Sequence, residues 1–256
     1  MAANNPKKNR GSAVHIEVRM IDLKQKHYLG GYFLTRLIPM NFGTYSDAMI
    51  HTCSKCINDH LVNIWSYSWT TDNDEQAEEA KENFQLSNRE IDLVRAWVDK
   101  NHNEHKLGWI NVFTDIDTAL EYKNTFFPHL SDIKVFALYF NERERADLLD
   151  EFKPQSDGMG EIGLRLTLLK GIEETNNDQF LGFDYIGIEF SGDFHTFHCH
   201  DLGGEFSNKF DLNLNEYGLF DSDMNSGQVL AYLNDESNGC EPVPWFVAKT
   251  KLVVSM

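Results

Sequence analysis

Two groups of cysteine and histidine residues have the types and spacing that could hold a metal ion. Their members are Cys53, Cys56 and His60 in one segment and His195, His198, Cys199 and His200 in another. Thiolate sulfur and imidazole nitrogen are the ligands that zinc prefers in proteins. A zinc site on Cys53, Cys56, His60 and His198 would make the chain a metal-dependent hydrolase, which we keep as an alternative.

The first of these groups also has a structural explanation, which we favour. Cys53, Cys56 and His60 occupy positions i, i+3 and i+7, on the same predicted helical stripe as the apolar residues Ile57 and Leu61. Small cysteine side chains are common in protein cores, where they behave as apolar groups. We therefore expect no bound metal and no other cofactor.

A run of carboxylates is the predicted partner-binding surface. Its members are Asp72, Asp74, Glu75, Glu78 and Glu79. Like charges at spacings of three and four residues weaken a helix by about 0.2–0.5 kcal/mol per pair. A sequence that keeps them gains either solubility or a field that attracts a basic partner.

The composition favours a basic partner as well. The 256 residues carry 23 Lys and Arg against 40 Asp and Glu, a formal net charge of −17. Such a charge repels phosphate backbones and anionic membranes, so we expect neither direct nucleic-acid binding nor membrane association. The chain has no secretory-type apolar stretch near its start and only four cysteines, so we expect a reduced, cytoplasmic protein.

Local sequence motifs do not nominate any catalytic residue. A Gly-x-Ser-x-Gly turn, which would expose a nucleophilic serine, does not occur. Gly158, Gly160, Gly203 and Gly204 lack the surrounding pattern that would aim backbone amides at a phosphate. The sequence therefore favours a binding protein over an enzyme.

The order of the helices and strands expected from the sequence predicts an α+β fold with two unequal halves. Residues 1–12 form a flexible basic tail, residues 13–153 a helix-rich N-terminal half, and residues 160–256 a mainly antiparallel β half. The stretch between Lys153 and Gly163 contains a proline and three glycines without periodicity, which is typical of a boundary. The two halves could still form one unit.

Periodicity and capping patterns predict several individual elements. Ser87 and Glu90 form a capping box before a helix. Further predictions are helices over 115–126, 141–152 and 229–233, strands over 133–140 and 164–169, a hairpin joining 183–190 to 194–200, and a last strand over 243–254. In the hairpin, Phe194 and Phe197 are expected on opposite faces and with different burial, one in the core and one available to a partner or to the other subdomain.

The second half contains segments that resemble the C-terminal part of immunity proteins, which bacteria encode beside polymorphic or contact-dependent toxins. The resemblance covers about 70 residues, within Gly182 to Ser222 and after Glu241. Its marks are Gly-Phe-Asp-Tyr-Ile, Phe194-His195-Thr196-Phe197, Asn215-Glu216-Tyr217-Gly218-Leu219 and Glu241-Pro242-Val243-Pro244-Trp245. These marks look structural, and the resemblance implies an inhibitor that binds one cognate toxin.

Together these observations predict an immunity-type inhibitor. Its partner would be a basic toxin domain, whose active site or fold it would block. A metal-dependent hydrolase and an acidic mimic of nucleic acid, whose carboxylates imitate phosphates, are the alternatives.

Overall fold

The structure, a computed structural model, describes residues 25–37, 40–42, 45–48, 52–54, 57–58, 61–62, 78, 81–103, 106–107, 112–154, 163–175, 177–190, 193–200 and 202–254. The strands are β1 (His27–Arg36), β2 (Met40–Phe42), β3 (Tyr45–Ala48), β4 (Ile133–Asn141), β5 (Gln179–Ile188), β6 (Phe194–Thr196) and β7 (Trp245–Leu252). The helices are α3 (Asn88–Asn103), α4 (Ile116–Phe126), α5 (Glu142–Glu151), α6 (Gly163–Leu169), α7 (Gly203–Phe210) and α8 (Ser226–Leu233), with the short 3₁₀ helices η1 (Phe197–His200) and η2 (Glu236–Asn238).

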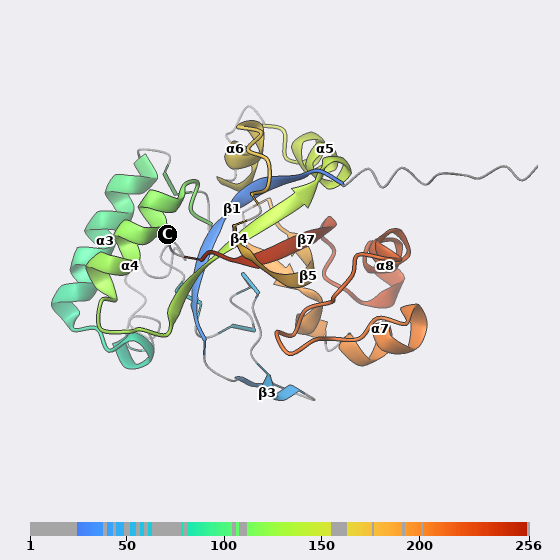
Figure 1. Cartoon of the computed structure of the whole chain (residues 1–256), viewed down its shortest axis with the longest axis horizontal. Coiled ribbons are helices and arrows are strands. Elements are labelled where there is room, and N and C mark those ends of the chain that lie inside the picture. The colour runs from blue at the N-terminus through green and yellow to red at the C-terminus, as the bar shows by residue number, and fades with distance from the viewer. Residues whose placement is uncertain are drawn as a thin grey trace, which may run out of the picture.

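One antiparallel sheet of five strands forms the centre of the molecule, in the order β1-β4-β7-β5-β6. The late strand β7 lies between β4 and β5, as Figure 1 shows. Along the sequence, β4 comes before the predicted boundary at residues 155–162 and β5 comes after it. The pairs Phe136 with Leu252 and Gly187 with Trp245 mark the two ends of β7. The two predicted halves therefore share one sheet.

The two faces of this sheet bury different apolar clusters because side chains alternate along a strand. On one face, Tyr185 and Val247 pack under α7 and α8. On the other, Ile186 and Ala248 pack with residues of α5 and α6. This alternation makes β5 and β7 the shared wall of both clusters.

Helices α3 and α4 form a third cluster with residues of β1 and β4. The predicted capping box is confirmed: the Ser87 backbone N–H donates to Glu90 Oε2 at 2.7 Å, and the Glu90 N–H donates to Ser87 Oγ at 3.4 Å. Asp115 caps α4 by accepting from the Thr118 N–H at 2.7 Å. None of the helices within the described ranges combines the length and the apolar character that a bilayer crossing needs.

The predicted division into a helix-rich N-terminal half and a mainly β C-terminal half is wrong. Helices α6, α7 and α8 lie in the second half, while β1 and β4 supply two strands of the sheet from the first. The run Leu164 to Leu169, predicted as a strand, forms α6. A short apolar run fits a buried strand and a buried helix equally well, so its periodicity did not decide between them.

The hairpin prediction is confirmed in part. The last three residues of β5, Ile186 to Ile188, pair with the three residues of β6, Phe194 to Thr196. After Thr196 the strand ends and the chain forms η1. Phe194 and Phe197 join different clusters and are both buried, at 2% and 0% exposure. The expected difference in burial between them is therefore wrong, because η1 folds Phe197 under α7.

Candidate functional site

A groove lies between α5 and α8, and the start of β7 forms its floor. Its first hollow, of about 320 Å³, is lined by Arg143, Glu144, Asp147, Glu151, Gly227, Leu230, Ala231, Asn234, Pro244, Trp245 and Phe246. An adjoining hollow of about 210 Å³ shares Glu151, Asn234 and Pro244 and adds Leu233, Glu236, Glu241, Pro242 and Val243. We call these two hollows together the α5–α8 groove.

The groove exists because β4 and β7 separate. Their pairing covers only Phe136 to Tyr139 on β4, after which the chain enters α5 at Glu142. Asn141 caps this helix by accepting from the Glu144 N–H at 2.9 Å. The first half of β7 therefore has β5 on one side and the side chains of α5 on the other.

Glu144 closes the gap that this separation leaves in the sheet. Its Oε2 accepts a hydrogen bond from the Val247 N–H at 3.1 Å, replacing the strand partner that β4 does not provide. The residue is buried, and this burial raises the pKa of the Glu144 carboxyl, although the Val247 N–H acts in the opposite direction. Glu144 is therefore a structural carboxylate that also lines the groove.

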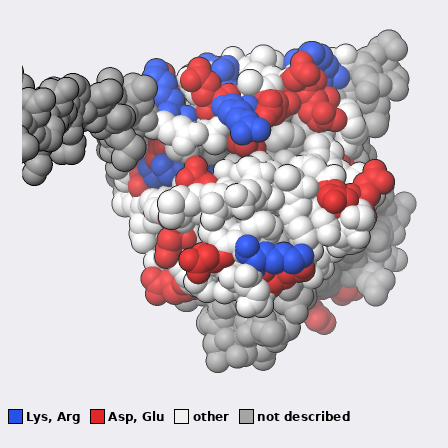
Figure 2. Space-filling view, turned by 90° about the vertical axis from the view of Figure 1, so that its right-hand side faces the viewer, with Lys and Arg blue, Asp and Glu red and all other residues white. Residues whose placement is uncertain are grey.

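The lining of the α5–α8 groove is strongly acidic. Its carboxylates are Glu144, Asp147, Glu151, Glu236 and Glu241. Arg143 is the single Lys or Arg among the described lining residues, and it lies 3.7 Å from Asp147 in an exposed ion pair. Figure 2, which shows the molecule from the right-hand side of Figure 1, has Asp and Glu side chains, with Lys and Arg side chains among them, around an uncharged central area. The groove thus offers acidic groups above an apolar floor.

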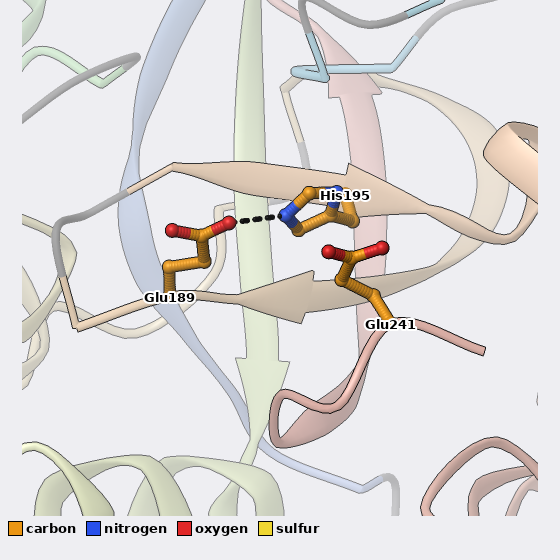
Figure 3. A group of neighbouring side chains, drawn as sticks. All are labelled: Glu189, His195 and Glu241. Carbon is orange, nitrogen blue, oxygen red and sulfur yellow. Dashed lines mark hydrogen bonds and ion pairs between the residues drawn. The ribbon is translucent and has the colours of Figure 1, made fainter. Parts of the chain in front are cut away.

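Three potential metal ligands meet beside one end of this groove. His195 of β6 has its Nε2 2.8 Å from Glu189 Oε1, and the Glu241 carboxylate lies on another side of the ring (Figure 3). One ligand atom from each of the three lies within 4.8 Å of the other two. We call Glu189, His195 and Glu241 the Glu–His–Glu cluster.

A glycine lets the chain close this cluster. Gly187 pairs with His195 across the hairpin, and a Cβ on Gly187 would lie 2.7 Å from Val243 Cγ2. The segment before β7 can therefore pack directly on β5 beside His195. Two further contacts hold Glu241 there: its N–H donates to His200 Nε2 at 3.3 Å, and its carbonyl accepts from Trp245 Nε1 at 3.1 Å.

Two residues of the predicted zinc site, Cys53 and His198, have surroundings that do not suit a metal ion. Cys53 is buried in an apolar cluster, and burial raises the pKa of its thiol well above the usual value, which disfavours the thiolate that zinc requires. His198 is fully buried in η1, with Nε2 2.7 Å from the carbonyl oxygen of Gly218. Cys56 and His60 lie outside the described residues. Within the described residues, neither Cys53 nor His198 belongs to a group of potential metal ligands.

The predicted acidic docking surface lies mostly outside the described residues. Asp72, Asp74, Glu75 and Glu79 are not described, and Glu78 is an exposed helical residue paired with Lys81. This surface remains a prediction.

Sequence reasoning missed both the groove and the Glu–His–Glu cluster. The spacing of Arg143, Asp147 and Glu151 places them on one helical face, and Pro242 and Pro244 mark an irregular segment before β7. Neither signal indicates that α5 faces α8. Comparison of the chain with protein-family models, curated proteins and solved structures found no match.

Proposed function

We propose that the protein is an immunity-type inhibitor that binds a cognate bacterial toxin domain and neutralises it. In this proposal the α5–α8 groove receives a basic segment of the toxin. The observation that carries it is the lining of that groove, with five carboxylates against the single Arg143.

The chemistry of the groove suits arginine or lysine side chains. The long aliphatic part of such a side chain can lie on Leu230, Pro244 and Trp245, while its charged end reaches Asp147 or Glu151. A bound partner would exclude water from these pairs and so strengthen their attraction. Helices and a strand form the walls, so little ordering is needed on binding.

The net charge of the whole chain also favours a basic partner. The net charge of −17 attracts a basic protein before contact, which raises the association rate. The resemblance of residues 182–222 and of Glu241 to Trp245 to immunity proteins agrees with this proposal. In the structure the second of these segments, Glu241 to Trp245, lines the groove.

Co-expression with the product of the adjacent gene tests the proposal. We expect that this product alone arrests bacterial growth and that the wild-type protein restores it. Gly227→Leu serves as a groove-filling variant, because a Cβ at Gly227 meets no atom within 4 Å and the added side chain enters the groove from α8.

We expect Gly227→Leu to accumulate as a folded protein and to restore growth poorly. The matched control is Gly204→Leu on α7, where an added Cβ also meets no atom within 4 Å. An adjacent product that is harmless, or equal protection by both variants, would contradict the proposal.

A further inference from the structure

We propose that Glu189, His195 and Glu241 bind one divalent transition-metal cation. This site differs from the cysteine and histidine set that the sequence suggested, and it shares Glu241 with the α5–α8 groove. Its ligands come from the end of β5, from β6 and from the segment before β7.

The donor atoms have the spacing that such an ion needs. In a tetrahedral site with bonds of 2.0–2.1 Å, neighbouring ligand atoms lie about 3.3 Å apart. His195 Nε2 and Glu189 Oε1 are 2.8 Å apart, and all three donors lie within 4.8 Å of one another. Small rotations of the two glutamate side chains would therefore bring the three donors around one ion.

The ligand types suit a divalent ion that accepts both oxygen and nitrogen. Two carboxylates with one neutral imidazole carry a charge of −2, which a divalent cation balances. Imidazole and carboxylate together are ligands for zinc, manganese and iron, whereas calcium prefers oxygen alone.

The protein already holds these groups in place. The strand pair Gly187 with His195 fixes the backbone of His195, and the Glu189 N–H donates to the Asp193 carbonyl at 2.9 Å. His200 and Trp245 hold both backbone polar groups of Glu241. Binding therefore requires reorientation of side chains and no rearrangement of the backbone.

The surroundings give an ion access and leave room for another ligand. All three residues are partly buried, and Glu241 lines the 210 Å³ hollow of the groove. Three protein ligands leave at least one coordination position for water or a ligand on that side. The bound ion would tie the β5–β6 hairpin to the segment before β7.

Titration of the untagged protein with Mn²⁺ tests this site. Mn²⁺ is chosen because it prefers carboxylate over thiolate ligands, so Cys53, Cys56 and Cys199 compete poorly for it. The loss of the electron paramagnetic resonance signal of free Mn²⁺ reports binding. We expect one ion per chain, and about tenfold or greater weakening in both His195→Ala and Glu241→Gln.

Glu236→Gln is the matched control, because Glu236 lines the same hollow and lies outside the cluster. We expect this variant to bind Mn²⁺ as the wild type does. We also expect Mn²⁺ to raise the melting temperature of the wild type and of Glu236→Gln but not of Glu241→Gln. Lack of binding to the wild type, or equal weakening by Glu236→Gln and Glu241→Gln, would overturn the proposal.

Discussion

Asp184 is a fully buried carboxyl that joins the sheet to the segment 52–54. Its Oδ1 accepts from Thr196 Oγ1 at 2.8 Å, and the Thr52 hydroxyl also hydrogen-bonds to it. Burial raises the pKa of Asp184 to about 7, although these hydrogen bonds act to lower it. The folded protein therefore keeps this group protonated well above the pH at which it ionises in the unfolded chain.

This difference predicts a pH-dependent stability. The contribution of Asp184 is fully present below about pH 4, where both states are protonated, and is lost as pH rises through about 7. The loss amounts to roughly 4 kcal/mol, from three pH units at about 1.4 kcal/mol each. Asp184→Asn, which cannot ionise, should remove this loss.

Urea unfolding from pH 4.5 to pH 8 measures the effect. We expect the unfolding free energy of the wild type relative to Asp184→Asn to fall from pH 4.5 to about pH 7 and to level off above it. Asp117→Asn, at an exposed position, controls for a general change in charge. A difference between wild type and Asp184→Asn that stays constant with pH would show that Asp184 has an ordinary pKa.

Sequence patterns could not indicate the role of Asp184 or Glu144. Both are acidic residues in a chain with 40 of them, and only burial separates them from solvated carboxylates. The capping pair Ser87 and Glu90 was predictable, because its partners are three residues apart and need no tertiary contact.

Among the elements, β5 depends on a glycine at its irregular point. The pairing of β5 with β7 shifts between Phe180 and Gly182, where Gly182 has φ of +152°. A Cβ there would lie 2.5 Å from Leu219 Cβ and 2.9 Å from the Phe220 carbonyl oxygen. Phe220 exchanges backbone hydrogen bonds with Phe183, so its backbone cannot withdraw freely.

We expect Gly182→Ala to lower the unfolding free energy by about 3 kcal/mol through overpacking and backbone strain. Gly227→Ala is the matched substitution, and it should raise stability by about 0.5–1 kcal/mol because it removes a helical glycine with open space around it. Thermal unfolding compares the two variants. Equal stability of Gly182→Ala and wild type would show that the bulge adapts.

The elements themselves were predictable to different degrees. Strand β4 and helices α4 and α5 match their predicted ranges closely, because long periodic patterns mark them. Helix α8 begins earlier than its predicted range, at Ser226, and its N-cap residue Asn225 makes no side-chain cap hydrogen bond. The 164–169 run and the end of the hairpin at Thr196 were not predictable, because packing against other elements decides them. Strand order also depends on contacts far apart in sequence, and the expected separation of helices into the first half and strands into the second was wrong.

At the scale of the whole molecule, two acidic surfaces are candidates for contact with a basic partner. The first is the α5–α8 groove, and the second is the predicted run containing Asp74, Glu75 and Glu78. A surface that only attracts the partner affects association, whereas a surface buried in the complex also affects dissociation. Kinetics can therefore distinguish their roles.

For the run, we expect reversal of Asp74, Glu75 and Glu78 to lysine to slow association about tenfold at low ionic strength. The dissociation rate and thermal stability should change little, because exposed charge pairs add little to a bound or folded state. Stopped-flow mixing with the adjacent gene product measures this. An association rate that is insensitive to the reversals and to salt would show that the run is only a solvated surface.

The central claim, that the α5–α8 groove receives the partner, is tested most directly by the dissociation constant of a groove-neutralised variant. Asp147→Asn, Glu151→Gln and Glu236→Gln together remove three groove charges and leave Glu144 and the Glu–His–Glu cluster intact. The control removes the same number of exposed charges with Asp92→Asn, Asp99→Asn and Asp117→Asn on α3 and α4.

Isothermal titration calorimetry of each triple variant with the adjacent gene product, at about 0.15 M salt, gives the two values to compare with wild type. Our account predicts that the groove variant binds about a hundredfold or more weakly. This corresponds to about 2.8 kcal/mol, and a single hydrogen bond to a charged group contributes about 1.5–3 kcal/mol. The control variant should stay within about threefold of wild type, because exposed charges far from the contact are largely screened. Equal dissociation constants for the two triple variants would contradict the account and place the partner elsewhere.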